Sequence, residues 1–258
     1  MIKVENIDVW GFEHAIRGMR NPLNSWDKSD SEEKYWCTDL GPNEEPHYCN
    51  NCTYDMCHPY EGDPVYVVGQ NDLDLMKRLY KAGTEHRKYL RQIFVSMDIV
   101  APLYWWKEFD TYKVGTVANS CSTMHKIAAK EFKLDDFSHE HLFGSFEPIQ
   151  RINSDSPNYY EVMFSNESIK IKSDTMMMCL IELLNFYREK YLETKDKKYW
   201  WQLIQLLPSS YNQRRTVTMN YENVVTIIRQ RVGHKLDEWK EFVEILSKLP
   251  YLDDICGE

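Results

Sequence analysis

An alternating run of apolar residues ahead of Pro102 constrains the fold more than any other stretch of the chain. Its apolar members are two residues apart, at Ile93, Val95, Met97 and Ile99. Successive side chains of a strand point to opposite faces, so this period predicts a strand with one buried face. Pro102 is expected to end that strand, because proline has no backbone N–H to donate to a neighbouring strand.

The segment that follows, from Pro102 to Ser122, combines chemically active side chains with large aromatic ones. It reads PLYWWKEFDTYKVGTVANSCS, and its charged and hydroxyl groups include Lys107, Glu108, Asp110, Tyr112 and Lys113. Such a mixture can hold an anion or a planar ring, which predicts the edge of a site. The alternative is an amphipathic helix with a solvated charged face and with Trp105 and Trp106 in the core.

Length and charge limit the class of protein. The 258 residues, 43% of them hydrophobic, are enough for one full core, and we expect residues 1–258 to form a single domain. The net charge of −9 argues against nucleic acid as the main partner, whereas a local basic pocket for a small nucleotide is compatible with it. No apolar run approaches the roughly 18 residues of a membrane span, and the opening residues MIKVENIDVWGF lack a secretory layout. We therefore expect a cytoplasmic protein with no membrane partner.

Residues 29–64 form an acidic, turn-rich and cysteine-rich stretch, which we expect to be an insertion. Four sulfurs lie in it, at Cys37, Cys49, Cys52 and Cys57. Tetrahedral zinc takes four such ligands, and a short polar insertion has little else to hold its shape, so one hypothesis is a structural zinc site. The alternative is a loop of free thiols, because the spacing is irregular and an odd total of seven cysteines is typical of reduced thiols.

Apolar periodicity also predicts the helices. They are expected over residues 13–19, 71–82, 123–132, 175–194, 221–230 and 236–249, after an opening strand over residues 1–10. Asn71 or Asp72 is expected to cap the second helix. Arg17 and Arg20, at the end of the first, can reach an anion through their forked guanidinium groups. The alternative is that both arginines are only solvated.

The late segment, residues 207–239, resembles the signature of the flavin-dependent thymidylate synthase (ThyX-like) family. It reads LPSSYNQRRTVTMNYENVVTIIRQRVGHKLDEW, and the family's segment runs Leu-Pro, Tyr-Thr, N-x-R-S-L-x-x-F-L-x-L-R, then His and Trp. The family's intervals are matched at Pro208, Asn220 and Arg231, and within one residue at His234 and Trp239.

The earlier block follows the same family order. Ala101-Pro102 stands where family members end a strand, and Thr111-Tyr112-Lys113 stands in the place of an Arg-His-Arg. Asn119 and Ser122 take the positions of the asparagine and serine that follow. Glu222 replaces the arginine of N-x-R, so several of the family's cations are missing.

The resemblance implies the thymidylate synthase-complementing protein-like fold, an α/β (α+β) arrangement in which an antiparallel sheet packs with helices. It also implies a homotetramer with active sites shared between subunits. The implied activity is transfer of a methylene carbon from folate to dUMP, with bound FAD and with NADPH as reductant. Similar proteins of unassigned role are familiar from phages and prophages.

The same resemblance implies roles for individual residues. The candidate catalytic residues are Ser122, near the dUMP base, Arg231, on the pyrimidine, and Tyr112. The candidate flavin contacts are Lys113, Asn119, Asn220, His234 and His86. The candidates for binding the substrate phosphate in place of the missing cations are Arg214, Arg215, Arg17 and Lys107. For Arg231 the alternative is a cation that complements a helix dipole, and for His86 it is a residue on a helix surface.

Two functions are compatible with these residues. The first is a divergent flavin-dependent thymidylate synthase-like methyltransferase that acts on a pyrimidine deoxynucleotide. The second is a non-catalytic nucleotide-binding protein, acting as a sensor, a sink or an assembly module. The second would keep the fold without flavin, because the Arg-His-Arg is absent.

Overall fold

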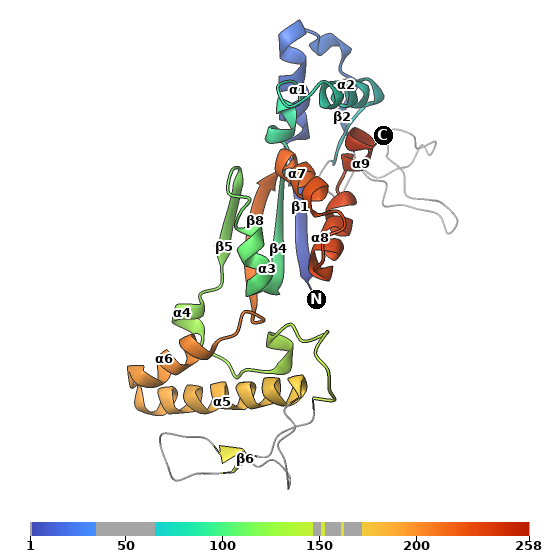
Figure 1. Ribbon diagram of the computed structural model, residues 1–258. Coiled ribbons are helices and arrows are strands. Elements are labelled where there is room, and N and C mark those ends of the chain that lie inside the picture. The colour runs from blue at the N-terminus through green and yellow to red at the C-terminus, as the bar shows by residue number, and fades with distance from the viewer. Residues whose placement is uncertain (1, 35–64, 147–150, 153–160, 163–171, 258) are drawn as a thin grey trace, which may run out of the picture.

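Four antiparallel strands form the central sheet of the protein (Figure 1). The computed structural model describes residues 2–34, 65–146, 151–152, 161–162 and 172–257. The sheet order is β1-β4-β8-β5, and the strands are β1 (Lys3–Trp10), β4 (Phe94–Pro102), β8 (Asn212–Asn220) and β5 (Thr116–Ser120). The strand predicted to end at Pro102 is confirmed as β4, and the opening strand is confirmed as β1.

The two faces of β4 differ as its sequence predicts. Val95, Met97 and Ile99 are at most 1% exposed, whereas Ser96 and Asp98 between them are partly exposed. Because antiparallel neighbours continue the same face, the apolar residues of β8 lie beside those of β4 and join one hydrophobic core. The sheet therefore has one apolar face and one polar face.

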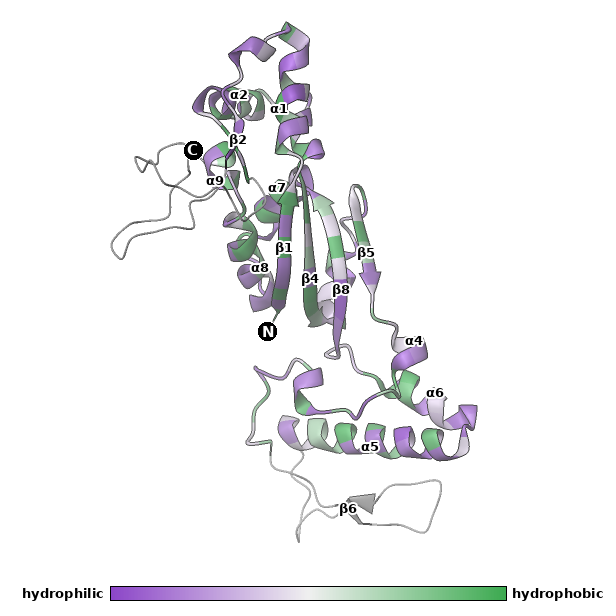
Figure 2. Ribbon diagram, turned by 180° about the vertical axis from the view of Figure 1, so that it is seen from behind, coloured by the Kyte–Doolittle hydropathy of each residue, from purple (hydrophilic) through white to green (hydrophobic). Residues whose placement is uncertain are grey.

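In the part of the chain that the structure describes, helices cover only the apolar face. They are α3 (Leu103–Phe109), α7 (Tyr221–Arg231) and α8 (Asp237–Ser247) (Figure 1). Trp105 and Trp106 of α3 are fully buried, so the alternative interpretation of this segment, a helix with both tryptophans in the core, is confirmed. Figure 2 shows the opposite face of the sheet, over which no described helix lies.

Different groups of elements lie beyond the two ends of the sheet (Figure 1). One end carries α1 (Phe12–Arg20), α2 (Gln70–Lys81), α9 (Leu252–Cys256) and the antiparallel pair of β2 (Glu32–Lys34) and β3 (Val65–Val67). The other end carries α4 (Thr123–Lys126), α5 (Ser173–Thr194), α6 (Lys197–Leu206) and the short pair β6 (Arg151–Ile152) and β7 (Glu161–Val162). Short 3-10 helices occur at Asn21–Leu23, Trp26–Lys28, Lys88–Gln92 and Leu134–Asp136.

The second end has an apolar cluster of its own. Ile181 and Leu184 of α5 pack there with Leu203 of α6 and with Ile127 and Ala128. The helix expected over residues 123–132 is therefore too long, because the chain leaves α4 after residue 126 and buries its next two side chains in this cluster. None of the described helices is both long and apolar enough to cross a membrane.

The predicted cap of α2 is also wrong. The helix begins one residue earlier than expected, after Gly69, so Asn71 and Asp72 lie inside its first turn. Their backbone N–H groups donate instead to the carboxylate of Asp30, at 2.9 and 3.1 Å. A side chain from a distant segment thus satisfies the free donors of the helix start, and the Asp72 carboxylate turns into the interior.

Candidate functional site

The ends of α3 and α7 bring together residues that are far apart in the sequence. Arg231 is the last residue of α7, and its Nη1 donates to Glu108 Oε2 at 2.5 Å. Its Nε donates to the Tyr112 hydroxyl at 2.9 Å, and Tyr112 donates in turn to Gln230 Oε1 at 3.0 Å. Two of the three predicted catalytic residues, Arg231 and Tyr112, are therefore in direct contact.

Glu108 stands at the centre of this group. Its Oε2 also accepts a hydrogen bond from Trp239 Nε1 at 3.1 Å and lies 3.3 Å from His234 Nε2. The Arg231 guanidinium lies over the Trp239 ring, 4.3 Å from its centroid, which is a cation–π contact. We call Glu108, Tyr112, Arg231, His234 and Trp239 the arginine cluster.

The turn after α7 places His234 in the cluster. Gly233 has a φ of 72°, in the left-handed region that glycine adopts without a steric penalty, and this ends the helix. The chain reverses there, and the His234 backbone N–H donates to the Arg231 carbonyl at 3.1 Å. The His234 ring consequently folds back to within 3.2 Å of Arg231 Nη1.

The arginine cluster is partly open to solvent. The side chains of Glu108, His234 and Arg231 are 36%, 24% and 15% exposed. Arg231 Nη2 has no partner among the described residues, so it can donate to a ligand oxygen. Because Glu108 holds a negative charge beside that guanidinium, the cluster suits the neutral carbonyl of a base better than a dianionic phosphate.

Glu108 had no predicted role in the site. The sequence shows it only as one of several charges in the segment after Pro102. The signal that could have singled it out is its position four residues before Tyr112, but its partner Arg231 is 123 residues away. Only the packing of α3 against α7 and α8 reveals that pair.

Ser122 and Asn220 each cap a helix. Ser122 Oγ accepts a hydrogen bond from the His125 backbone N–H at 3.0 Å and begins α4. Asn220 Oδ1 accepts one from the Asn223 backbone N–H at 3.0 Å and begins α7. Both side chains therefore have structural partners, and their predicted roles at the base and the flavin stay predictions.

Arg214 and Arg215 lie on opposite faces of β8, so within one chain they cannot both bind one phosphate. Arg214 is on the open face, where its Nη2 donates to Asp98 Oδ2 at 2.7 Å. Arg215 is on the covered face, where its Nη1 donates to Asp110 Oδ1 at 2.7 Å and its guanidinium lies 4.2 Å from the Trp106 ring centroid. The period of two in a strand separates them.

The open face carries a row of hydrogen-bonded polar groups around Asp98. Its carboxylate accepts from Thr216 Oγ1 at 2.5 Å, from Arg214 and from Asn6 Nδ2 at 2.9 Å. These donors, Thr216 foremost, hold the pKa of Asp98 well below its usual range. Asn119, a predicted flavin contact, lies opposite Thr216 on the edge strand β5 and is exposed on this face.

The remaining predicted cations and the second histidine lie at the surface. Lys107, Lys113 and His86 are exposed, and their side chains make no hydrogen bond or ion pair with any described residue. Arg17 is exposed and lies 3.6 Å from Glu13 of the same helix. The structure brings none of these four into the arginine cluster.

Glu222, which replaces a family arginine, has a partner within the fold. Arg87 is buried, and its Nη2 and Nε donate to Glu222 Oε1 at 2.9 and 3.2 Å. Glu222 Oε2 is buried with no partner among the described residues. The departure from the family pattern therefore removes one cation and adds an internal ion pair.

The four predicted zinc ligands, Cys37, Cys49, Cys52 and Cys57, lie outside the described residues. Among the described residues, Cys121, Cys179 and Cys256 are free thiols. Burial raises the pKa of the Cys256 thiol, and also that of Cys179. A raised pKa lowers the thiolate fraction, so neither residue is an activated nucleophile.

Comparison with known proteins identifies the fold. No family model and no curated protein sequence matches the chain. A crystal structure of thymidylate synthase X (ThyX) from Helicobacter pylori with FAD and dUMP is similar over 100% of this chain and 98% of that one, at a TM-score of 0.58 and 13% identity. A second structure of this flavin-dependent enzyme complexed with FAD and dUMP covers 98% of both chains, at a TM-score of 0.57 and 12% identity. The predicted thymidylate synthase-complementing protein-like fold is confirmed.

Proposed function

We propose that the protein is a divergent flavin-dependent thymidylate synthase-like enzyme that binds a dUMP-like pyrimidine deoxynucleotide. The observation that carries this is the arginine cluster. On a fold shared with enzymes solved with FAD and dUMP, it joins Arg231, Tyr112 and His234, which the motif resemblance had selected from separate segments.

Arg231 would contact the pyrimidine in this proposal. Its free Nη2 would donate to a carbonyl of the base, while Glu108 and Tyr112 hold the guanidinium in place. A charged donor at that position favours negative charge that builds up on the carbonyl oxygen. When bound, the flavin would supply the hydride, methylene folate the carbon and NADPH the electrons.

The predicted flavin contacts do not form one cradle within a single chain. Asn119 is exposed on the open face of the sheet, whereas His234 lies among the helices on the covered face. His86 lies on the turn that follows α2. A flavin site built from these residues needs a second copy of the chain, so we include in the proposal a homotetramer with shared sites.

Binding measurements with a matched control test this proposal. We expect FAD to give a visible flavin spectrum after excess cofactor is removed, and dUMP to bind in calorimetry. Arg231→Ala should abolish dUMP binding, whereas Arg229→Ala, an exposed arginine one half-turn earlier on α7, should leave it unchanged. Sedimentation velocity should show a tetramer. A protein that binds neither FAD nor dUMP would end the proposal.

A specific observation favours the second candidate, a non-catalytic nucleotide-binding protein. Glu108 neutralises Arg231, and the two arginines of β8 are each paired with an aspartate on opposite sides of the sheet. Among the described residues of one chain, the arginine cluster therefore offers no unpaired cation to a substrate phosphate. Nucleotide binding that persists in Ser122→Ala and is lost in Arg231→Ala, without turnover, would support it. Turnover of dUMP with methylene folate would exclude it.

A structural zinc in the insertion is a separate proposal. It rests on four cysteine sulfurs within residues 29–64. Metal analysis should find zinc in the wild-type protein and less in Cys49→Ser/Cys52→Ser. Equal zinc content in the two proteins would exclude the site.

A further inference from the structure

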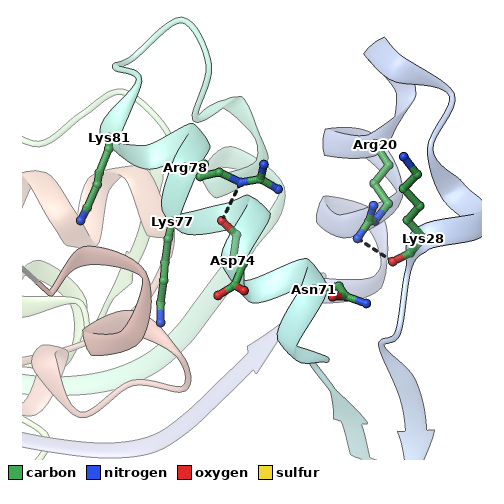
Figure 3. Close-up of a pocket in the computed structure, with 7 residues that line it drawn as sticks. All are labelled: Arg20, Lys28, Asn71, Asp74, Lys77, Arg78 and Lys81. Atoms are coloured by element: carbon green, nitrogen blue, oxygen red, sulfur yellow. Dashed lines mark hydrogen bonds between the residues drawn. The ribbon is translucent and has the colours of Figure 1, made fainter.

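A cavity of about 690 Å³ lies beside α2 (Figure 3). Its positively charged lining residues are Arg20, Lys28, Lys77, Arg78 and Lys81. Among the described residues that line it, Asp74 is the only acidic one. The wall of the cavity is therefore basic, although the whole chain carries a net charge of −9. We call this feature the α2 cavity.

Arg20 is fully engaged in the fold. Its Nε donates to Asp72 Oδ1 at 2.6 Å, and its Nη1 and Nη2 donate to the backbone oxygens of Ser25 and Lys28 at 3.1 and 3.0 Å. Asp72 neutralises its charge. The contribution of Arg20 to the cavity is to fix the loop that carries Lys28 beside α2.

The other cations are free to bind a ligand. Arg78 donates from Nε to the Asp74 backbone oxygen at 3.3 Å, and neither of its terminal nitrogens has a partner among the described residues. The side chains of Lys28, Lys77 and Lys81 make no hydrogen bond or ion pair with any described residue. Figure 3 shows Arg78 extended toward Arg20, while Lys77 and Lys81 leave α2 in another direction, with their ammonium ends pointing away from Arg20 and Lys28.

The helix dipole does not account for this arrangement. Cations in the last turn of a helix complement its dipole, which explains Arg78 and Lys81 individually. Lys77 and Lys81 are four residues apart, however, and like charges at that spacing destabilise a helix. Lys28 belongs to a different segment and gains nothing from the dipole of α2. A bound anion would offset the repulsion between Lys77 and Lys81.

We propose that the α2 cavity binds a small molecule through a chain of two or more phosphate groups. The Arg78 guanidinium matches phosphate oxygens in a fork, and the lysines supply point charges for neighbouring phosphates. The cavity volume lies within the range of about 300–1,000 Å³ typical of small-molecule sites. No aromatic side chain is among its described lining residues, so the lining offers partners to phosphates and no stacking partner to a base.

Calorimetry with inorganic tripolyphosphate tests this assignment. We expect the wild-type protein to bind tripolyphosphate more tightly than orthophosphate. Lys77→Gln/Lys81→Gln should weaken tripolyphosphate binding by about tenfold or more, since each lost contact involves charged groups. Arg78→Lys keeps the charge but loses the fork, so its loss should be smaller. The control Lys126→Gln/Lys248→Gln changes the net charge equally at exposed residues of α4 and the end of α8, and should bind as the wild type does.

A second titration, with a nucleoside triphosphate, distinguishes the sources of the phosphate chain. If the nucleoside triphosphate binds more tightly than tripolyphosphate, the ligand is a nucleotide. If the two bind equally tightly, the cavity binds the phosphate chain alone. Both results support the proposal. It is overturned if tripolyphosphate does not bind at millimolar concentration, or if the control variant loses as much affinity. It is also overturned if a DNA or RNA duplex displaces tripolyphosphate at a lower phosphate concentration. The α2 cavity shares no residue with the arginine cluster, so this result does not depend on the proposed enzyme activity.

Discussion

The buried pair of Arg20 and Asp72 gives the sharpest stability prediction. Their side chains are 5% and 0% exposed, and Arg20 Nε lies 2.6 Å from Asp72 Oδ1. The Asp72 carboxylate also accepts hydrogen bonds from the hydroxyls of Ser29 and Ser31, each at 2.7 Å. Asp72→Asn keeps the size of the side chain, removes its charge and replaces one of its two acceptor oxygens by a donor, so it breaks the ion pair and the hydrogen bonds to that oxygen.

The expected cost follows from what the substitution leaves behind. Removing one partner of a buried ion pair leaves the other charge uncompensated, which typically costs about 3–5 kcal/mol. We expect Asp72→Asn to lower the free energy of unfolding by about this amount. Replacing both partners together, as Arg20→Met/Asp72→Leu, removes the buried charge altogether and should cost far less than Asp72→Asn alone.

Urea unfolding followed by tryptophan fluorescence measures these differences. Asp74→Asn is the matched control, because Asp74 is an exposed carboxylate on the same helix, and it should shift stability by less than about 0.5 kcal/mol. If Asp72→Asn costs less than about 1 kcal/mol, or if the double variant is less stable than the single one, the reasoning about the buried charge is wrong.

The pair of Arg20 and Asp72 also predicts how the stability of the protein depends on pH. Burial acts to raise the pKa of Asp72, but hydrogen bonds from Ser31, Ser29 and Arg20 outweigh it and hold the pKa below its usual value. A carboxyl group whose pKa is lower in the folded state stabilises the protein above its unfolded pKa of about 3.9. That stabilisation is lost as the pH falls through the folded pKa. Asp72→Asn should therefore flatten the acid side of the stability profile.

Four further predictions concern individual side chains or substitutions. Trp105 and Trp239 are both fully buried, but of the two only Trp239 has a hydrogen-bond acceptor for its Nε1 among the described residues. In urea unfolding, Trp239→Phe should therefore lower the free energy of unfolding by about 1–2 kcal/mol more than Trp105→Phe does. Gly115 has a φ of 76°, in the left-handed region that is unfavourable for alanine, so Gly115→Ala should lower the free energy of unfolding by about 1–2 kcal/mol. Asn220→Ala removes the side chain that caps α7 and should lower it by about 1 kcal/mol. The hydrogen bonds to Asp98, Thr216 foremost, lower its pKa in the folded protein, so its carboxylate stabilises the fold at pH values above its unfolded pKa. NMR titration should therefore find a pKa for Asp98 below that of an aspartate in an unfolded chain, and an unshifted pKa would contradict this.

The strands of the central sheet differ in how well the local sequence pattern predicts them. β4 is predictable because every second residue is apolar and buried. β8 pairs with it along its whole length yet was not predicted, because Gln213 and Arg215 occupy positions on its covered face and interrupt the apolar period. β5 is an exposed edge strand in which every residue after Thr116 is exposed, so it has no buried face to give a pattern. Both strands are defined by their pairing partners.

The sequence alone determined the apolar face of β4, the buried tryptophans of α3, the approximate extents of α5, α7 and α8, and the order of residues that resembles ThyX. These depend on spacing along the chain, which periodicity records. The tertiary structure decided that Glu108 meets Arg231, that Arg214 and Arg215 part to opposite faces, and that Lys28 joins the cations of α2. Those outcomes depend on contacts between segments that are distant in the sequence. The energy of an electrostatic interaction depends on the distance between the charges in space, and the number of residues between two charges does not give that distance.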